Sequence, residues 1–132
     1  MRIAASAPGK FVLSGEYAVL DGAPAICVAV DCRAVVRIEA HDGPCHTVTA
    51  PGFSATRGRF TAEAGGLRWL ADGEDFFLFE TTWNASSPKV AESSLLITLD
   101  TTAFREAGGG SKLGLGSSAA LTAALATALQ QN

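Results

Sequence analysis

The feature that most constrains this sequence is a glycine-rich turn that runs directly into a strongly helical segment. The turn reads Gly114-Leu115-Gly116-Ser117-Ser118, and in the alanine-rich stretch after it Leu121, Leu125 and Leu129 recur every four residues. Alanine and leucine are strong helix formers, and this spacing places the three leucines on one face. We therefore predict a helix that begins at the glycines and packs its leucine stripe against a core.

A helix that begins in this way is suited to bind an anion. Its first N–H groups have no partner within the helix, and the helix dipole adds about half a positive charge at that end. The hydroxyls of Ser117 and Ser118 could donate to phosphate or ligate Mg²⁺, and Lys112 lies just upstream. The pattern favours a polyphosphate ligand. The alternatives are that Gly114 and Gly116 only form a turn, that Ser117 caps the helix, and that Lys112 is a solvated surface residue.

Two better-known phosphate-binding patterns do not fit. A Walker A loop has Ser or Thr after its Gly-Lys pair, whereas Gly9-Lys10 is followed by Phe11. The dinucleotide fingerprint requires a strand directly before its first glycine and an acidic residue about 20 positions later. The chain ends before that position is reached.

The rest of the sequence predicts a sheet. Strands are expected at residues 3–7 and 11–13, on either side of a Pro8-Gly9 turn, and the apolar run at residues 25–30 is typical of a buried strand. Residues 33–40 alternate in polarity, which predicts a strand with one face exposed to water. Further strands are predicted at residues 46–50, 53–56, 58–61 and 94–99, and a helix at residues 75–85.

Composition restricts the class of protein. The chain has 132 residues, 48% hydrophobic and 17% charged, which suits one domain with a single core. The net charge of -3 provides no basic field, so nucleic acid and membrane surfaces are not expected partners. No signal peptide or membrane-spanning stretch is recognisable. Cys27, Cys32 and Cys45 lack C-x-x-C spacing, and we expect reduced thiols in a cytoplasmic protein.

Two segments, in the right order, resemble the signature motifs of the GHMP kinases, the family named for galactokinase, homoserine kinase, mevalonate kinase and phosphomevalonate kinase. Residues 7–25, APGKFVLSGEYAVLDGAPA, resemble the first motif. Residues 112–120, KLGLGSSAA, resemble the second motif, the phosphate-binding loop. The Gly-Glu-Tyr sequence at residues 15–17 and the lysine-led loop look most like phosphomevalonate kinases, with mevalonate kinases second.

The resemblance implies an α+β fold over residues 1–132, a mostly antiparallel sheet backed by helices, similar to domain 2 of ribosomal protein S5. It implies an enzyme that uses ATP and Mg²⁺ to phosphorylate phosphomevalonate in isoprenoid synthesis, or mevalonate or another small acceptor. Lys10 would be the catalytic residue, because its charge offsets charge on the transferred phosphoryl group, and Ser118 would ligate the metal. The acceptor would contact Lys10, Ser14, Glu16 and Tyr17. The nucleotide would contact Lys112, Gly114, Leu115, Gly116, Ser117, Ser118 and Ala119.

The resemblance leaves part of the family pattern unmatched. Family members are larger, with a carboxy-terminal domain that carries a third glycine-rich motif, and their aspartate near the acceptor has no counterpart in this sequence. We therefore expect an amino-terminal domain without that second domain, inactive alone, with exposed apolar surface that a homodimer could cover. The alternatives are a non-catalytic nucleotide-binding module and a structural domain whose glycines only form turns.

Overall fold

The computed structural model describes residues 1–89 and 92–131. Within these residues a sheet of six strands forms in the order β1-β2-β6-β3-β4-β5. Neighbouring strands are antiparallel except β3 and β6, which are parallel. The strands are β1 (Arg2–Ser14), β2 (Ile26–His41), β3 (His46–Ala50), β4 (Ser54–Glu63), β5 (Gly66–Ala71) and β6 (Ser94–Asp100).

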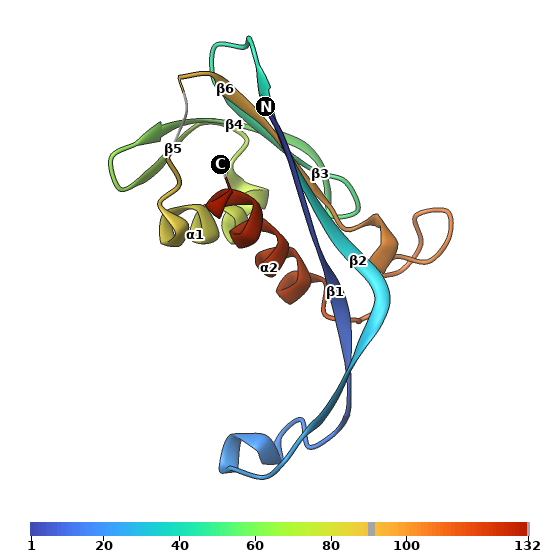
Figure 1. The fold of residues 1–132 in the computed structure, drawn as a ribbon. Coiled ribbons are helices and arrows are strands. Elements are labelled where there is room, and N and C mark those ends of the chain that lie inside the picture. Colours follow the sequence, from blue (N-terminus) through green and yellow to red (C-terminus); the bar gives the residue numbers. More distant parts are fainter. Residues whose placement is uncertain (90–91, 132) are drawn as a thin grey trace.

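Two α-helices, α1 (Phe77–Ser86) and α2 (Ser117–Gln130), cover one face of this sheet (Figure 1). Short 3-10 helices are formed by η1 (Ala18–Asp21), η2 (Glu74–Phe76) and η3 (Thr102–Phe104). The predicted α+β arrangement with a mostly antiparallel sheet is therefore confirmed. No helix in the described part of the chain is long and apolar enough to span a membrane.

Helix α2 forms the centre of the core. The predicted stripe of Leu121, Leu125 and Leu129 is buried, as are the alanines that precede each leucine by one residue. The helix packs on β1 and β2 and contacts α1. Val36 and Ile38 of β2 are also fully buried, which confirms the predicted alternation in residues 33–40. Apolar burial of this kind is the main force that seats the helix on the sheet.

An aromatic cluster holds the other end of the molecule together. Phe79 and Trp83 lie one helical turn apart on α1, and both pack on Phe60 of β4, with ring centroids 5.4 Å and 5.1 Å away. Trp69 of β5 contacts the same ring, and its Nε1 donates to Glu80 at 2.9 Å. The helix predicted at residues 75–85 is therefore confirmed, whereas β5 was not predicted.

The prediction of two strands separated by a Pro8-Gly9 turn is wrong, because β1 runs unbroken through both residues. The register against β2 shifts between the pairs Pro8–Arg33 and Lys10–Ala29, with one residue between them on β1 and three on β2, so the extra residues lie on β2 and Gly9 continues the strand. The strand tolerates Pro8 because β1 is an edge strand, where a missing N–H removes no ladder hydrogen bond on the open side. Similarly, the strands predicted at residues 53–56 and 58–61 are parts of the single strand β4, which begins one residue later, at Ser54.

The strand predicted at residues 25–30 is present as the start of β2, from Ile26, but it is not buried. β2 pairs with β6 only from Val35 to His41, so its first residues have β1 as their sole neighbour. This part of the β1–β2 hairpin is a two-stranded arm that reaches away from the helices (Figure 1). Ile26 is 58% exposed there, so its apolar character does not reflect packing in the core.

Candidate functional site

The two motifs of the sequence meet at one hydrogen bond. The backbone N–H of Lys10, in β1, donates to the carbonyl of Leu115 in the glycine loop at 2.8 Å. Gly9 makes this approach possible, because a Cβ there would lie 2.4 Å from the Leu115 oxygen and 2.5 Å from the ring of Phe104. Segments about a hundred residues apart in the chain are thus held in direct contact.

The side chain of Lys10 lies against Gly116, where α2 begins. A Cβ on Gly116 would be 3.0 Å from Cγ of Lys10. Gly116 also has a φ of +74°, a left-handed conformation that a residue with a side chain adopts only at a cost. Glycine at position 116 therefore allows both the left-handed turn and the close approach of the Lys10 side chain.

Helix α2 starts without a side-chain cap. Gly116 is the capping residue, and no side chain accepts from the first N–H groups of the helix. The alternative that Ser117 caps the helix is therefore wrong, because Ser117 is already the first helical residue. Ser117 is buried and Ser118 is exposed. The uncapped end carries the positive pole of the helix dipole, which is the arrangement that binds phosphate in other proteins.

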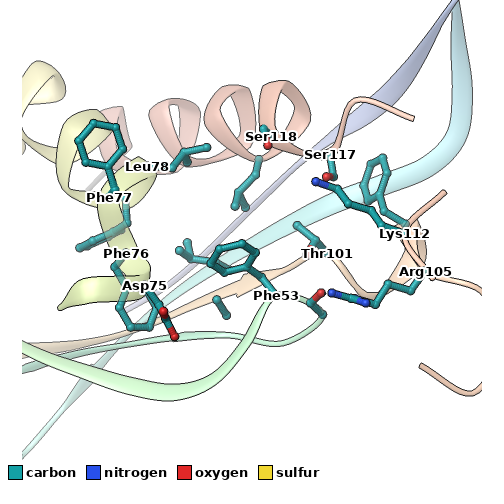
Figure 2. A pocket seen from close by; sticks show the side chains of 16 residues that line it. Phe53, Asp75, Phe76, Phe77, Leu78, Thr101, Arg105, Lys112, Ser117 and Ser118 are labelled. Carbon is teal, nitrogen blue, oxygen red and sulfur yellow. The ribbon is translucent and has the colours of Figure 1, made fainter. Parts of the chain in front are cut away.

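A cavity of about 250 Å³ opens beside this helix end. One end of the cavity is lined by residues in or near the glycine loop: Arg105, Lys112, Ser117 and Ser118. Figure 2 shows Arg105 and Lys112 entering from the same side, with Lys112 close to Ser117. The opposite end, next to α1, is lined by Asp75, Phe76 and Phe77, and the ring of Phe53 lies between this end and Arg105. We call this hollow the central cavity; it has a cationic end and an aromatic end.

The cationic end is built by a hairpin that spans residues 105–112. Arg105 and Lys112 face each other across an antiparallel bridge, and Glu106 N–H donates to the Ser111 carbonyl at 3.1 Å. At the base of the hairpin, Leu113 N–H donates to the carbonyl of the buried Phe104 at 2.8 Å. The pairing explains why two basic side chains separated by three glycines reach the same cavity.

These cations lack carboxylate partners. The ion pairs of residues 1–89 and 92–131 join Arg2 to Glu39, Arg37 to Asp100 and Arg68 to Glu63, all away from the glycine loop. Lys10, Arg105 and Lys112 form none among the described residues. Three cations without a carboxylate partner therefore lie around the start of α2, in a chain whose net charge is -3.

The aromatic end holds one fixed carboxylate. Oδ2 of Asp75 accepts from the hydroxyls of Ser54 at 2.5 Å and Thr56 at 3.1 Å, so the carboxylate has a defined orientation. Phe53 lies on the turn before β4 and is 62% exposed, with its ring at the cavity. Sequence reasoning missed Phe53, Asp75 and Arg105. Only for Arg105 was a signal present, since a basic residue flanks each side of the glycine triplet.

The predicted acceptor residues lie elsewhere. Ser14, Glu16 and Tyr17 are at the far end of the arm, exposed to solvent, and none of them lines the central cavity. Of the residues predicted to contact the nucleotide, Lys112, Ser117 and Ser118 line the cavity, whereas the other four belong to the adjoining loop and helix start. Those four are Gly114, Leu115, Gly116 and Ala119.

Sequence comparison relates the chain to archaeal enzymes. It is 33% identical over 91 residues to the mevalonate kinase of Thermococcus sibiricus, a match that covers 66% of this chain and 23% of that enzyme. It is 39% identical over 66 residues to the mevalonate kinase of Pyrococcus furiosus, covering 42% of this chain and 18% of the enzyme. The matches thus span a quarter or less of these relatives. No family model matches the sequence.

Solved structures share the fold over nearly the whole chain. A Listeria innocua protein superposes with a TM-score of 0.72 and 25% identity, covering 99% of this chain and 36% of the other. Streptococcus pneumoniae phosphomevalonate kinase, solved with phosphomevalonate and AMPPNP, gives 0.63 and 21% over 98% of this chain and 36% of its own. Methanococcus jannaschii mevalonate kinase gives 0.62 and 17%, covering 99% and 40%. In sequence this chain is related to mevalonate kinases of the GHMP family, and it has the fold of the amino-terminal domains of GHMP kinases.

Proposed function

We propose that the central cavity and the glycine loop bind ATP. The phosphates would lie at the uncapped start of α2, where backbone N–H groups, the hydroxyls of Ser117 and Ser118, and Lys112 can donate to them. The base would lie toward the exposed ring of Phe53, which offers a face for stacking. The division of the cavity into a cationic and an aromatic end matches the two chemical parts of a nucleotide.

The donor set also fits a magnesium complex of the nucleotide. No group of three or more His, Cys, Asp or Glu side chains in the described part of the chain could hold a metal by itself. Mg²⁺ in kinases is bound largely by the phosphates of the nucleotide and by water, with few protein ligands. The exposed hydroxyl of Ser118, beside the proposed phosphate site, is the protein ligand we assign to it.

We infer that the whole protein transfers the γ-phosphoryl group to a mevalonate-type acceptor, either phosphomevalonate or mevalonate. This proposal is supported by the sequence relatives, which are mevalonate kinases, and by a structural neighbour solved with phosphomevalonate. Lys10 would stabilise negative charge on the transferred group, because its side chain lies at the start of the proposed phosphate site. Ser14, Glu16 and Tyr17, which lie on the arm outside the central cavity, would contact the acceptor from there.

One observation carries this proposal, the hydrogen bond between Lys10 N–H and the Leu115 carbonyl. A turn-forming glycine loop could occur in any fold, and so could a lysine on an edge strand. Their direct contact places a cation beside a helix start that already attracts anions. Phosphoryl transfer depends mainly on positioning and on stabilisation of charge, so this contact is the part of the machinery that the chain itself supplies.

Calorimetric titration of MgATP into the purified chain tests nucleotide binding. Ser118→Ala and Lys112→Ala should each weaken binding by about tenfold, because each removes a donor to charged phosphate. Thr127→Ala is the matched control, since its exposed hydroxyl lies on the same helix away from the loop. Folded protein that binds no nucleotide, or binds it equally well in all variants, would contradict the proposal.

A turnover assay with mevalonate and with 5-phosphomevalonate tests the reaction. Phosphorylation of one acceptor and not the other would decide between the two kinase activities. Binding of MgATP without turnover of either acceptor would limit the function of this chain to nucleotide binding, the outcome expected of the non-catalytic module.

A further inference from the structure

Arg105 occupies a special position between the central cavity and a second hollow. This second hollow, about 580 Å³ in volume, lies between the turn at residues 52–55 and the hairpin at residues 105–112. Arg105, Gly52 and Phe53 line both hollows. Arg105 is therefore part of the wall of the cavity that holds the proposed phosphate site, although neither motif of the family contains it.

Two backbone carbonyls hold this guanidinium in place. Nε of Arg105 donates to the carbonyl of Gly52, and one terminal nitrogen donates to the carbonyl of Gly110 at 3.1 Å. The first contact reaches across to the turn before β4, and the second reaches the tip of its own hairpin. The side chain is thereby fixed and half-buried, so little conformational entropy remains to be lost when it binds a ligand.

Both of these acceptors are neutral. In the described part of the chain no carboxylate pairs with Arg105, in contrast to Arg2, Arg37 and Arg68 on the sheet. A guanidinium remains charged at any physiological pH and has five N–H donors in a planar fork. A half-buried charge without a counter-charge is costly, and an anion that enters the adjoining cavity would remove that cost.

We propose that Arg105 is a phosphate-binding residue, which together with Lys112 clamps the outer phosphates of the nucleotide. The inference rests on the proposed nucleotide site and adds to it a second permanent cation. The bridge between Arg105 and Lys112 presents the two charges together. The remaining N–H groups of the fork suit two oxygens of one phosphate, a geometry that a lysine cannot provide.

The test measures binding of MgATP, MgADP, AMP and adenosine to the full chain and to Arg105→Gln, which removes the charge but keeps an amide donor. ATP affinity should fall by about ten- to a hundredfold, as expected for loss of a charge-assisted hydrogen bond, whereas adenosine affinity should change less than about twofold. Arg57→Gln is the control, an exposed arginine of β4 that lines neither hollow. It should leave all four affinities unchanged.

Each other outcome has a definite meaning. Equal losses of affinity for ATP and for adenosine in Arg105→Gln would overturn the inference, because they would show that Arg105 only maintains the structure of the cavity wall. Unchanged ATP affinity in Arg105→Gln would overturn it while leaving the nucleotide site intact. Failure of the wild-type chain to bind any of the four would refute the nucleotide site and this inference together.

Arg105→Lys is a second variant, for use if Arg105→Gln does not fold. It retains the charge but loses the planar fork, so ATP affinity should lie between those of the wild type and Arg105→Gln. A thermal unfolding curve for each variant confirms that it is folded at the temperature of the binding measurement. If Arg105→Gln unfolds, the same ratio of ATP to adenosine affinity is measured in Arg105→Lys, and an unchanged ratio would overturn the proposal.

Discussion

The contact between β1 and the glycine loop can be tested by adding one methyl group at Gly9. A Cβ there would lie 2.4 Å from the carbonyl oxygen of Leu115, whereas ordinary contact begins at 3.4 Å. The strand and the loop must therefore separate by about 1 Å, since the oxygen belongs to the backbone and cannot rotate away. That shift would stretch the hydrogen bond from Lys10 to Leu115 from 2.8 Å to about 3.8 Å, beyond its useful range.

The expected loss of stability in Gly9→Ala is about 2 to 4 kcal/mol, which combines overpacking with one lost backbone hydrogen bond. At roughly 3 to 5 °C per kcal/mol for a chain of this size, Tm should fall by about 10 °C in thermal unfolding followed by circular dichroism. MgATP binding should weaken as well, because Lys10 moves away from the loop.

Gly65→Ala provides the comparison for this experiment. Gly65 has a φ of +85° and no atom within 4 Å of an added Cβ, so the substitution costs only the left-handed backbone, about 1 to 2 kcal/mol. It should not change nucleotide binding. If Gly9→Ala proves as stable as the wild type, or loses less stability than Gly65→Ala, then the tight approach of the two motifs is not a feature of the protein in solution.

Two further predictions concern the core. Burial, followed by the positive charge of His41, lowers the pKa of His46, whose Nδ1 accepts from Leu95 N–H at 3.0 Å. The imidazole of His46 takes up a proton below about pH 6.5 in the unfolded chain, but only at lower pH in the folded chain, so the free energy of unfolding should fall as pH drops from 6.5. His46→Gln should make this pH dependence weaker in urea titrations. An unchanged pH dependence in the variant would show that His46 is not its source. Leu125→Ala should cost about 2 to 5 kcal/mol in urea unfolding, since the side chain is fully buried, and Leu70→Ala, at an exposed position, should cost less than half as much; equal losses would contradict the proposed core.

Much of the site could be predicted from local sequence. The leucine repeat that ends at Leu129 fixes which face of α2 is buried, and the glycines before Ser117 fix where that helix can start. Strands His46–Ala50 and Ser94–Asp100 were predicted to within one residue. Each of these features depends on the spacing of neighbouring residues, which the sequence displays directly.

Other features depend on neighbours that are distant in the chain. Pro8 and Gly9 have the composition of a turn, yet they continue a strand because β2 pairs along it and the loop packs against it. The run that begins at Ile26 has the composition of a buried strand, yet it is exposed because no third strand reaches it. Whether an apolar residue is buried, or a turn-forming residue forms a turn, depends on the segments that pack beside it. The local sequence pattern does not specify those segments.

The sequence by itself revealed the resemblance to GHMP kinases, the order of the two motifs and the helix that follows the second motif. The tertiary structure alone decided that Lys10 touches the glycine loop, that Asp75 closes the far end of the cavity, and that Arg105 joins Lys112 at its cationic end. The physical reason is that motifs are local in the chain, whereas a binding site is a meeting of side chains whose positions are set by sheet pairing and helix packing.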